Sequence, residues 1–87
     1  MHTRAMLQQM LPDAEMRVAR GAEYLRAQEA RVAALKGKGQ LAEHSRQLLE
    51  IMKQTQDLQI EHVALLKREL AATEERSSTS DRIMGTA

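Results

Sequence analysis

Hydrophobic residues recur at helical spacing along two long stretches of the chain, and a short Gly37-Lys38-Gly39 segment separates the two stretches. In the first stretch aliphatic residues repeat every seven positions, at Leu11, Val18, Leu25 and Val32. In the second stretch they follow one face of a helix, at Leu41, Leu48, Met52, Leu66 and Leu70. Such a pattern is typical of two helices that fold back on one another around a glycine-containing turn. The predicted fold class is therefore all-α, an antiparallel two-helix hairpin of the coiled-coil type.

Local signals set the expected boundaries of these helices. Proline suits the first position of a helix and disfavours helical geometry in the residue before it, so we expect the first helix to begin at Pro12. Gly37 suits the left-handed position that follows a helix end. The resulting division is a short amphipathic segment at 1–11, a helix at 12–36, a turn at 37–39, a helix at 40–75 and a flexible tail, rich in Ser and Thr, at 76–87.

The position of the turn predicts which residues of the two helices are neighbours. In an antiparallel pair centred on Lys38, residues at equal distances before and after that position lie side by side. Leu65, Leu66 and Leu70 then lie opposite the 1–11 segment, which is the expected cover for the longer second helix. Gly21 lies opposite Thr55, so the two helix axes can approach closely there.

The apolar face of the second helix is too wide for a single neighbouring helix. Its hydrophobic positions span an arc of roughly 200°, whereas packing on one neighbour requires roughly 100°. A symmetric dimer that forms a four-helix bundle is the expected solution, because two-fold homodimers are the commonest oligomers. A helix of another protein laid on the same face is the alternative. The predicted interaction surface comprises Leu48, Leu49, Ile51, Met52, Leu58, His62, Val63, Leu65, Leu66 and Leu70.

Polar residues interrupt the hydrophobic face and have two interpretations. Thr55, Gln59 and His62 lie at the centre of the face of the second helix, and Gln28 lies on the face of the first. These residues can line a polar pocket inside a bundle. They can instead fix helix register and oligomeric state at some cost in stability, as single polar residues do in coiled coils. We favour the second interpretation.

His62 is the sharpest single candidate for chemistry, because an imidazole can titrate near neutral pH or bind a metal. A metal site needs three or four ligands, and no His or carboxylate lies three or four residues from His62 on its own helix. His44 is 18 residues away, or about 27 Å along a helix. We therefore expect no metal site.

Composition argues against several classes of function. Charged residues make up 29% of the 87 residues, alternate in sign and nearly cancel to +1, whereas a nucleic-acid-binding protein usually carries a patch of one sign. The chain has no cysteine for a disulfide, a thiolate metal site or a nucleophile. No apolar run approaches the roughly 18–20 residues that span a bilayer, so we expect a cytoplasmic protein without stable membrane insertion. No catalytic triad or Gly-rich phosphate loop can be assigned, so we expect neither enzyme activity nor a cofactor.

Several segments resemble a group of short, uncharacterised alphaproteobacterial proteins that look like charged helical hairpins with a glycine-bearing turn. The similar segments, between residues 13 and 71, are Val18-Ala19-Arg20-Gly21, Gln28, Val32-Ala33-Ala34-Leu35, Gly39, Leu48-Leu49, His62 and Leu66-Lys67-Arg68-Glu69-Leu70. At the start of the second helix, Gln40-Leu41 replaces an Asp-Thr type of cap. The group has no established activity, so the resemblance implies the hairpin fold and recurrent positions at Gln28 and His62.

Together these patterns predict a non-enzymatic helical interaction module. The first hypothesis is a homodimeric structural or adaptor protein that associates through the wide face of the second helix. The alternative is a small regulator that binds a helix of a signalling or transcription protein through the same face.

Overall fold

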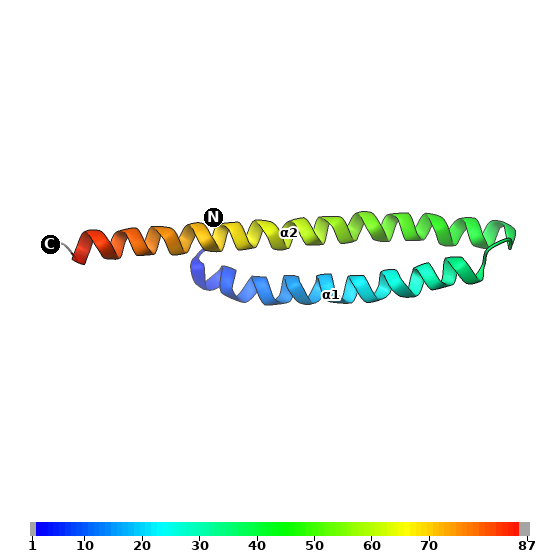
Figure 1. Ribbon diagram of the computed structural model, residues 1–87, viewed down its shortest axis with the longest axis horizontal. Helices are drawn as coiled ribbons and strands as arrows, with labels where there is room; N and C mark the ends of the chain where they lie inside the picture. The colour runs from blue at the N-terminus through cyan, green and yellow to red at the C-terminus, as the bar shows by residue number, and fades with distance from the viewer. Residues whose placement is uncertain (1, 86–87) are drawn as a thin grey trace.

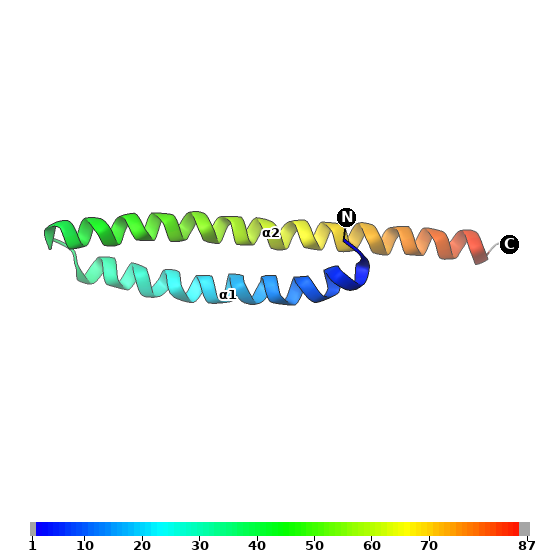
Figure 2. The same ribbon diagram turned by 180° about the vertical axis from the view of Figure 1, so that it is seen from behind.

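Two antiparallel helices lie side by side along most of the chain. The computed structural model describes the backbone of residues 2–85 and the side chains of residues 2–76. This part of the chain contains two helices and no strand, namely α1 (Arg4–Ala34) and α2 (Gly39–Gly85). Figures 1 and 2 show them joined by a short turn at one end of a rod that measures 74 × 15 × 15 Å. The predicted all-α antiparallel hairpin is confirmed.

The turn between the helices depends on two glycines in the left-handed region of backbone conformation. α1 ends at Ala34, and the N–H of the cap residue Leu35 donates to the carbonyl of Arg31 at 3.0 Å. Gly37 has a φ of 83° and Gly39 a φ of 62°, values that a residue with a Cβ rarely adopts. The predicted left-handed position of Gly37 is confirmed, and α2 begins at Gly39, one residue earlier than predicted.

The prediction that the first helix begins at Pro12 is wrong, because α1 begins at Arg4 and continues through the proline. The Thr3 hydroxyl caps the helix by accepting a hydrogen bond from the Met6 N–H at 3.2 Å. A proline inside a helix removes one backbone hydrogen bond and costs about 3 kcal/mol relative to alanine. Burial of the preceding turns against α2 offsets this cost, since Leu7 is completely buried there.

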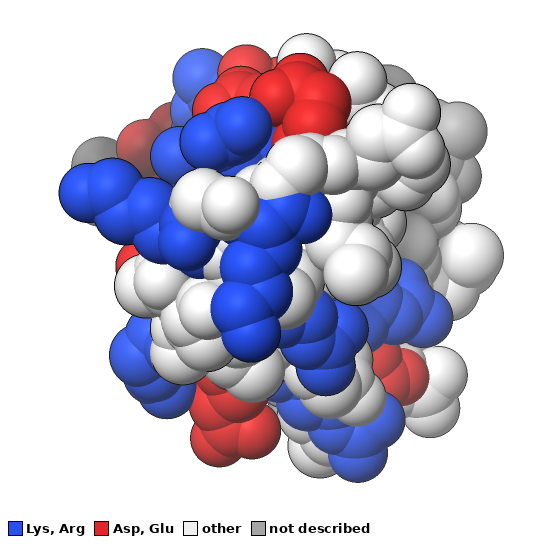
Figure 3. All heavy atoms as spheres, turned by 90° about the vertical axis from the view of Figure 1, so that its right-hand side faces the viewer, with Lys and Arg blue, Asp and Glu red and all other residues white. Residues whose placement is uncertain are grey.

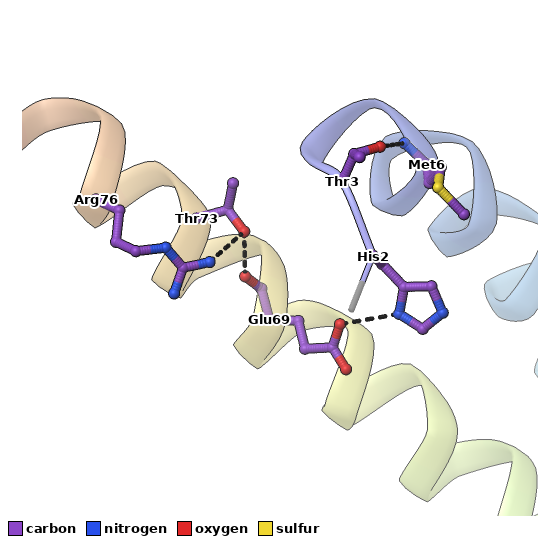
Figure 4. Close-up of polar contacts among 6 residues, drawn as sticks. All are labelled: His2, Thr3, Met6, Glu69, Thr73 and Arg76. Carbon is purple, nitrogen blue, oxygen red and sulfur yellow. Dashed lines mark hydrogen bonds and ion pairs between the residues drawn. The ribbon is translucent and has the colours of Figure 1, made fainter. Parts of the chain in front are cut away.

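Polar contacts also hold the N-terminal segment against α2 (Figure 4). His2 Nδ1 lies 3.1 Å from Oε2 of Glu69, the contact drawn in Figure 4. Arg4 Nη2 also lies 3.9 Å from Oε1 of Glu74. Both pairs are exposed, and pairs of this kind contribute under about 1 kcal/mol each. The described part of the predicted 1–11 segment therefore covers α2 around Leu66 and Leu70, as expected, but it does so as part of α1.

The second helix is longer than predicted. The sequence predicted an end at residue 75 and a flexible tail at 76–87, whereas α2 continues to Gly85 and extends past the start of α1 (Figure 1). No proline or glycine interrupts the chain between Gly39 and Gly85, and each further helical residue adds one backbone hydrogen bond. Residues 86 and 87 of the predicted tail lie outside the described residues.

The hydrophobic core between the helices is thin. Its buried cluster and the partly buried residues around it comprise Leu7, Ala14 and Leu66, with Met10, Leu11, Val63 and Leu70. Only one further hydrophobic residue of the described part, Ala42, is buried, so two of the four buried hydrophobic residues are alanines. A core of this size supplies little hydrophobic free energy, and small domains with such cores usually depend on association for stability.

Candidate interaction surface

Two rows of residues run along α2 at heptad spacing, and one row is shifted from the other by a single residue. The inner seam faces α1, contains no exposed residue and comprises Ala42, Ser45, Leu49, Met52, Gln56, Gln59, Val63, Leu66 and Leu70. The outer seam precedes it by one residue at each step, contains only exposed residues and comprises Leu41, His44, Leu48, Ile51, Thr55, Leu58, His62 and Leu65. Alternating steps of three and four residues keep each seam on one side of the helix.

The outer seam exposes large hydrophobic side chains. Leu41 is 63% exposed, Ile51 60% and Leu58 65%, while Leu48 and Leu65 are about half exposed. Single exposed leucines are ordinary on protein surfaces, but a contiguous row of them marks an interaction surface. One residue turns a helix by about 100°, so the two seams point in directions that suit a four-helix bundle, in which each helix packs on two neighbours.

The ten residues of the predicted interaction surface divide equally between the two seams. Those on the inner seam pack toward α1 and are Leu49, Met52, Val63, Leu66 and Leu70. Those on the outer seam are exposed and are Leu48, Ile51, Leu58, His62 and Leu65. The single wide face is therefore two faces, and only the outer one is available to a partner. Leu41, His44 and Thr55 also belong to it, and their sequence signal is a second heptad series offset by one residue, which the position of α1 separates from the first.

Two buried glutamines cross between the helices. Gln28 of α1 is 4% exposed and donates from Nε2 to the Ser45 carbonyl of α2 at 2.9 Å. Gln56 of α2 is 7% exposed and donates from Nε2 to the Val18 carbonyl of α1 at 2.7 Å. The Gln28 contact fits the register function predicted for that residue. Gln56 was missed, although it continues the heptad series of the inner seam.

Gly21 lies against Gln56 rather than against Thr55, the predicted neighbour. A Cβ at position 21 would overlap Gln56 Oε1, so the absent side chain makes room for the amide. Thr55 is exposed, and its hydroxyl donates to the Ile51 carbonyl at 3.0 Å. At Gly21 the predicted register is thus correct to within one residue, and that residue decides whether a side chain lies on the inner or the outer seam.

Two open hollows lie where the outer seam meets α1, and Thr55 and Gln59 line both of them. The larger hollow has a volume of about 220 Å³ and is also lined by Ala14, Arg17, Leu58 and His62. The smaller has a volume of about 160 Å³ and is also lined by Gly21, Tyr24, Ile51, Met52 and Gln56. The three polar residues predicted at the centre of the face therefore meet at an open surface hollow.

Charge is distributed unevenly around α2. Opposite the outer seam, Arg46 pairs with Glu43 at 2.9 Å and Lys53 pairs with Glu50 at 3.7 Å, both as exposed contacts. In the end-on view of Figure 3, Lys and Arg side chains spread over the left, the centre and the lower part of the molecule, while uncharged side chains cover much of the upper right. The outer seam contains no Asp, Glu, Lys or Arg. One side of α2 therefore carries exposed charged pairs, whereas the other exposes a row of hydrophobic side chains.

Other kinds of site find no support in the part of the chain that the structure describes. It contains no group of three or more His, Cys, Asp or Glu side chains placed to hold a metal ion. Within the same residues, neither helix has a stretch long and apolar enough to cross a membrane. Comparison of the chain with protein-family models, with curated proteins and with solved structures finds no match. The candidate functional site is the outer seam with its hollows.

Proposed function

We propose that this protein is a non-enzymatic helical interaction module that associates with a second copy of itself through the outer seam of α2. In such a dimer two hairpins form a four-helix bundle that serves as a structural or adaptor element. The observation that carries the proposal is the row of exposed hydrophobic residues at heptad spacing along the uncharged side of α2.

The outer seam exposes more large aliphatic side chains than the described part of the hairpin buries completely. Burial of a leucine or isoleucine side chain stabilises a structure by about 1.5–3 kcal/mol. The outer seam offers five such side chains per chain, whereas only two leucines are fully buried inside the described hairpin. Association through the outer seam therefore supports the fold as well as the function.

A second copy is the favoured occupant because a two-fold dimer needs only one self-complementary surface. A helix of a signalling or transcription protein would use the same residues, with its own apolar face laid on the outer seam. The two cases differ in what the isolated chain does at high concentration, which can be measured directly.

Sedimentation equilibrium of the purified chain tests the proposal. At micromolar concentration we expect a helical dimer. Leu58→Glu places a carboxylate in the middle of the outer seam and is expected to raise the dimer dissociation constant by about 100-fold or more, because burial of an unpaired charge costs several kcal/mol.

Ile60→Glu is the matched control. Ile60 is on the same turn of α2 and is 49% exposed, but it lines a hollow on the opposite side with Glu15 and Lys67. The same substitution there is expected to leave the dimer intact. A helical, cooperatively unfolding monomer at hundreds of micromolar would contradict self-association and leave a heterologous helix as the occupant.

A further inference from the structure

The sequence of the outer seam is almost palindromic, and its centre lies at residue 53. From the N-terminal end its residues are Leu, His, Leu, Ile, Thr, Leu, His and Leu, at positions 41, 44, 48, 51, 55, 58, 62 and 65. Leu41 mirrors Leu65, and His44 mirrors His62. In the centre, Ile51 mirrors Thr55, and both are β-branched.

Two helices related by a two-fold axis perpendicular to them bring together residues at equal distances on either side of the axis. On the basis of the proposed self-association, we infer that two α2 helices pair antiparallel with the axis at residue 53, so that His44 faces the partner's His62. Leu48 then faces the partner's Leu58, and Leu41 faces the partner's Leu65. Every leucine of the outer seam meets a leucine, and every histidine meets a histidine.

The ends of the helix fit this register. With the axis at residue 53, the partner's Gly39, where its α2 begins, reaches the level of residue 67. The hydrophobic part of the outer seam ends at Leu65, just inside that limit. The next position of the same heptad series is Glu69, whose carboxylate lies 3.1 Å from His2 of its own chain. The hydrophobic stretch therefore has the length of the overlap between two antiparallel helices.

The residues beside the outer seam are compatible with the antiparallel register. The adjacent row of exposed residues on the solvent side consists of Gln40, Gln47, Gln54, Glu61 and Arg68. In the antiparallel register Glu61 lies nearest the partner's Gln47, and Arg68 lies nearest the partner's Gln40. Glu61 and Arg68 therefore each meet a neutral side chain of the partner, and no like charges lie together along this row.

In this register the hollows beside α1 lie level with residues near the axis and with outer-seam side chains of the partner. The larger hollow, of about 220 Å³, is at the level of Leu58 and His62 and so faces the partner's Leu48. The smaller hollow, of about 160 Å³, is lined by Ile51 and Thr55 and lies next to the axis. Insertion of a partner side chain into such a space is the knobs-into-holes packing of helical bundles.

Cysteine crosslinking tests the register, because the chain has no cysteine of its own. The double variant His44→Cys/His62→Cys keeps every leucine of the outer seam and is expected to form a covalent dimer under mild oxidation. Each single variant is expected to crosslink at least about tenfold more slowly, because its two thiols would lie about 27 Å apart along the bundle. A disulfide requires Cα atoms within about 7 Å.

Arg46→Cys/Ile60→Cys is the matched control for this experiment. Positions 46 and 60 have the same symmetry about residue 53 but lie on the opposite side of α2, so no covalent dimer is expected.

A second test uses charge: His44→Asp/His62→Lys pairs opposite charges only in the antiparallel register. Its dimer is expected to be at least about tenfold tighter than that of His44→Asp/His62→Asp, in which like charges meet in either orientation.

The outcomes separate the register from the proposed function. Crosslinking of the His44→Cys single variant as fast as the double variant would overturn the antiparallel register and leave self-association intact. The register would also be overturned if the chain dimerises but two results fail together: the double cysteine variant does not crosslink, and the two charge variants have the same dimer dissociation constant. A chain that stays monomeric in sedimentation would remove both proposals together.

Discussion

Gln28 and Gln56 show how single polar residues specify the alignment of two helices. Each amide donates to a backbone carbonyl of the other helix, so the contact depends on main-chain position rather than on the side chain opposite. A buried amide that loses its acceptor costs roughly 1–3 kcal/mol, which penalises a shifted register. Gln56 contributes less free energy than a fully hydrogen-bonded amide, because its buried Oε1 has no hydrogen-bond partner in the described part of the chain. The pair therefore contributes more to a unique alignment than to stability.

Substitution of Gly21 tests the close contact with Gln56. Alanine is favoured over glycine in a helix by about 1 kcal/mol, so Gly21→Ala would ordinarily stabilise α1. Here the new Cβ displaces the Gln56 amide and breaks its bond to the Val18 carbonyl, which cancels that gain. In a Gln56→Ala background the same substitution is expected to be more favourable by about 1 kcal/mol, as measured by chemical unfolding of the four variants of the cycle. Equal effects in the two backgrounds would mean that the residues are not in contact.

At the scale of whole elements, the hairpin, its turn and its register could be predicted because they depend on local signals. Heptad spacing defined two helices, Gly37 marked the turn, and distance from Lys38 gave the neighbour of Gly21 to within one residue. The start of α1 could not be read in this way. The local preference of Pro12 for a first helical position was overridden by the burial of Leu7, a contact made with a distant part of the chain.

The two seams of α2 were merged for a different reason. Two heptad series offset by one residue look like one wide apolar face when each helix is considered alone. Only the position of α1 shows that Leu66 is 2% exposed while its neighbour Leu65 is 50% exposed. For the same reason Gln56, at an inner-seam position, could not be distinguished from the neighbouring Thr55.

The path of α1 through Pro12 leads to a prediction for the element. Pro12→Ala restores an N–H that can donate to the Gln8 carbonyl and is expected to stabilise the hairpin by about 1–3 kcal/mol in guanidinium unfolding. Amide exchange at residues 4–11 should slow at the same time. Gln9→Ala, an exposed change between two good helix formers, is the control and should have little effect on either measurement. If the helix began at Pro12, the proline variant would resemble this control.

At the scale of the whole molecule, the hairpin has the composition of half a bundle. The contact between α1 and α2 is long but includes buried alanines and glutamines, and half of the large hydrophobic side chains on the two seams of α2 lie exposed on the outer seam. Register and hydrophobic stabilisation are thus divided between two surfaces of one helix. The inner seam aligns the hairpin, and the outer seam is proposed to supply much of the free energy that keeps it folded.

This division predicts that thermal stability depends on protein concentration. If folding and association are coupled, a 100-fold rise in concentration, from about 2 to about 200 μM, should raise the thermal midpoint by on the order of 5 °C or more in circular dichroism. The neighbours Leu65 and Leu66 separate the two contributions. Leu66→Ala removes a buried side chain inside the hairpin and should lower stability by about 2–5 kcal/mol at every concentration. Leu65→Ala should lower the midpoint mainly through weaker association, so raising its concentration should recover part of the loss. A midpoint that does not move with concentration in the unsubstituted chain would show that each hairpin is stable by itself.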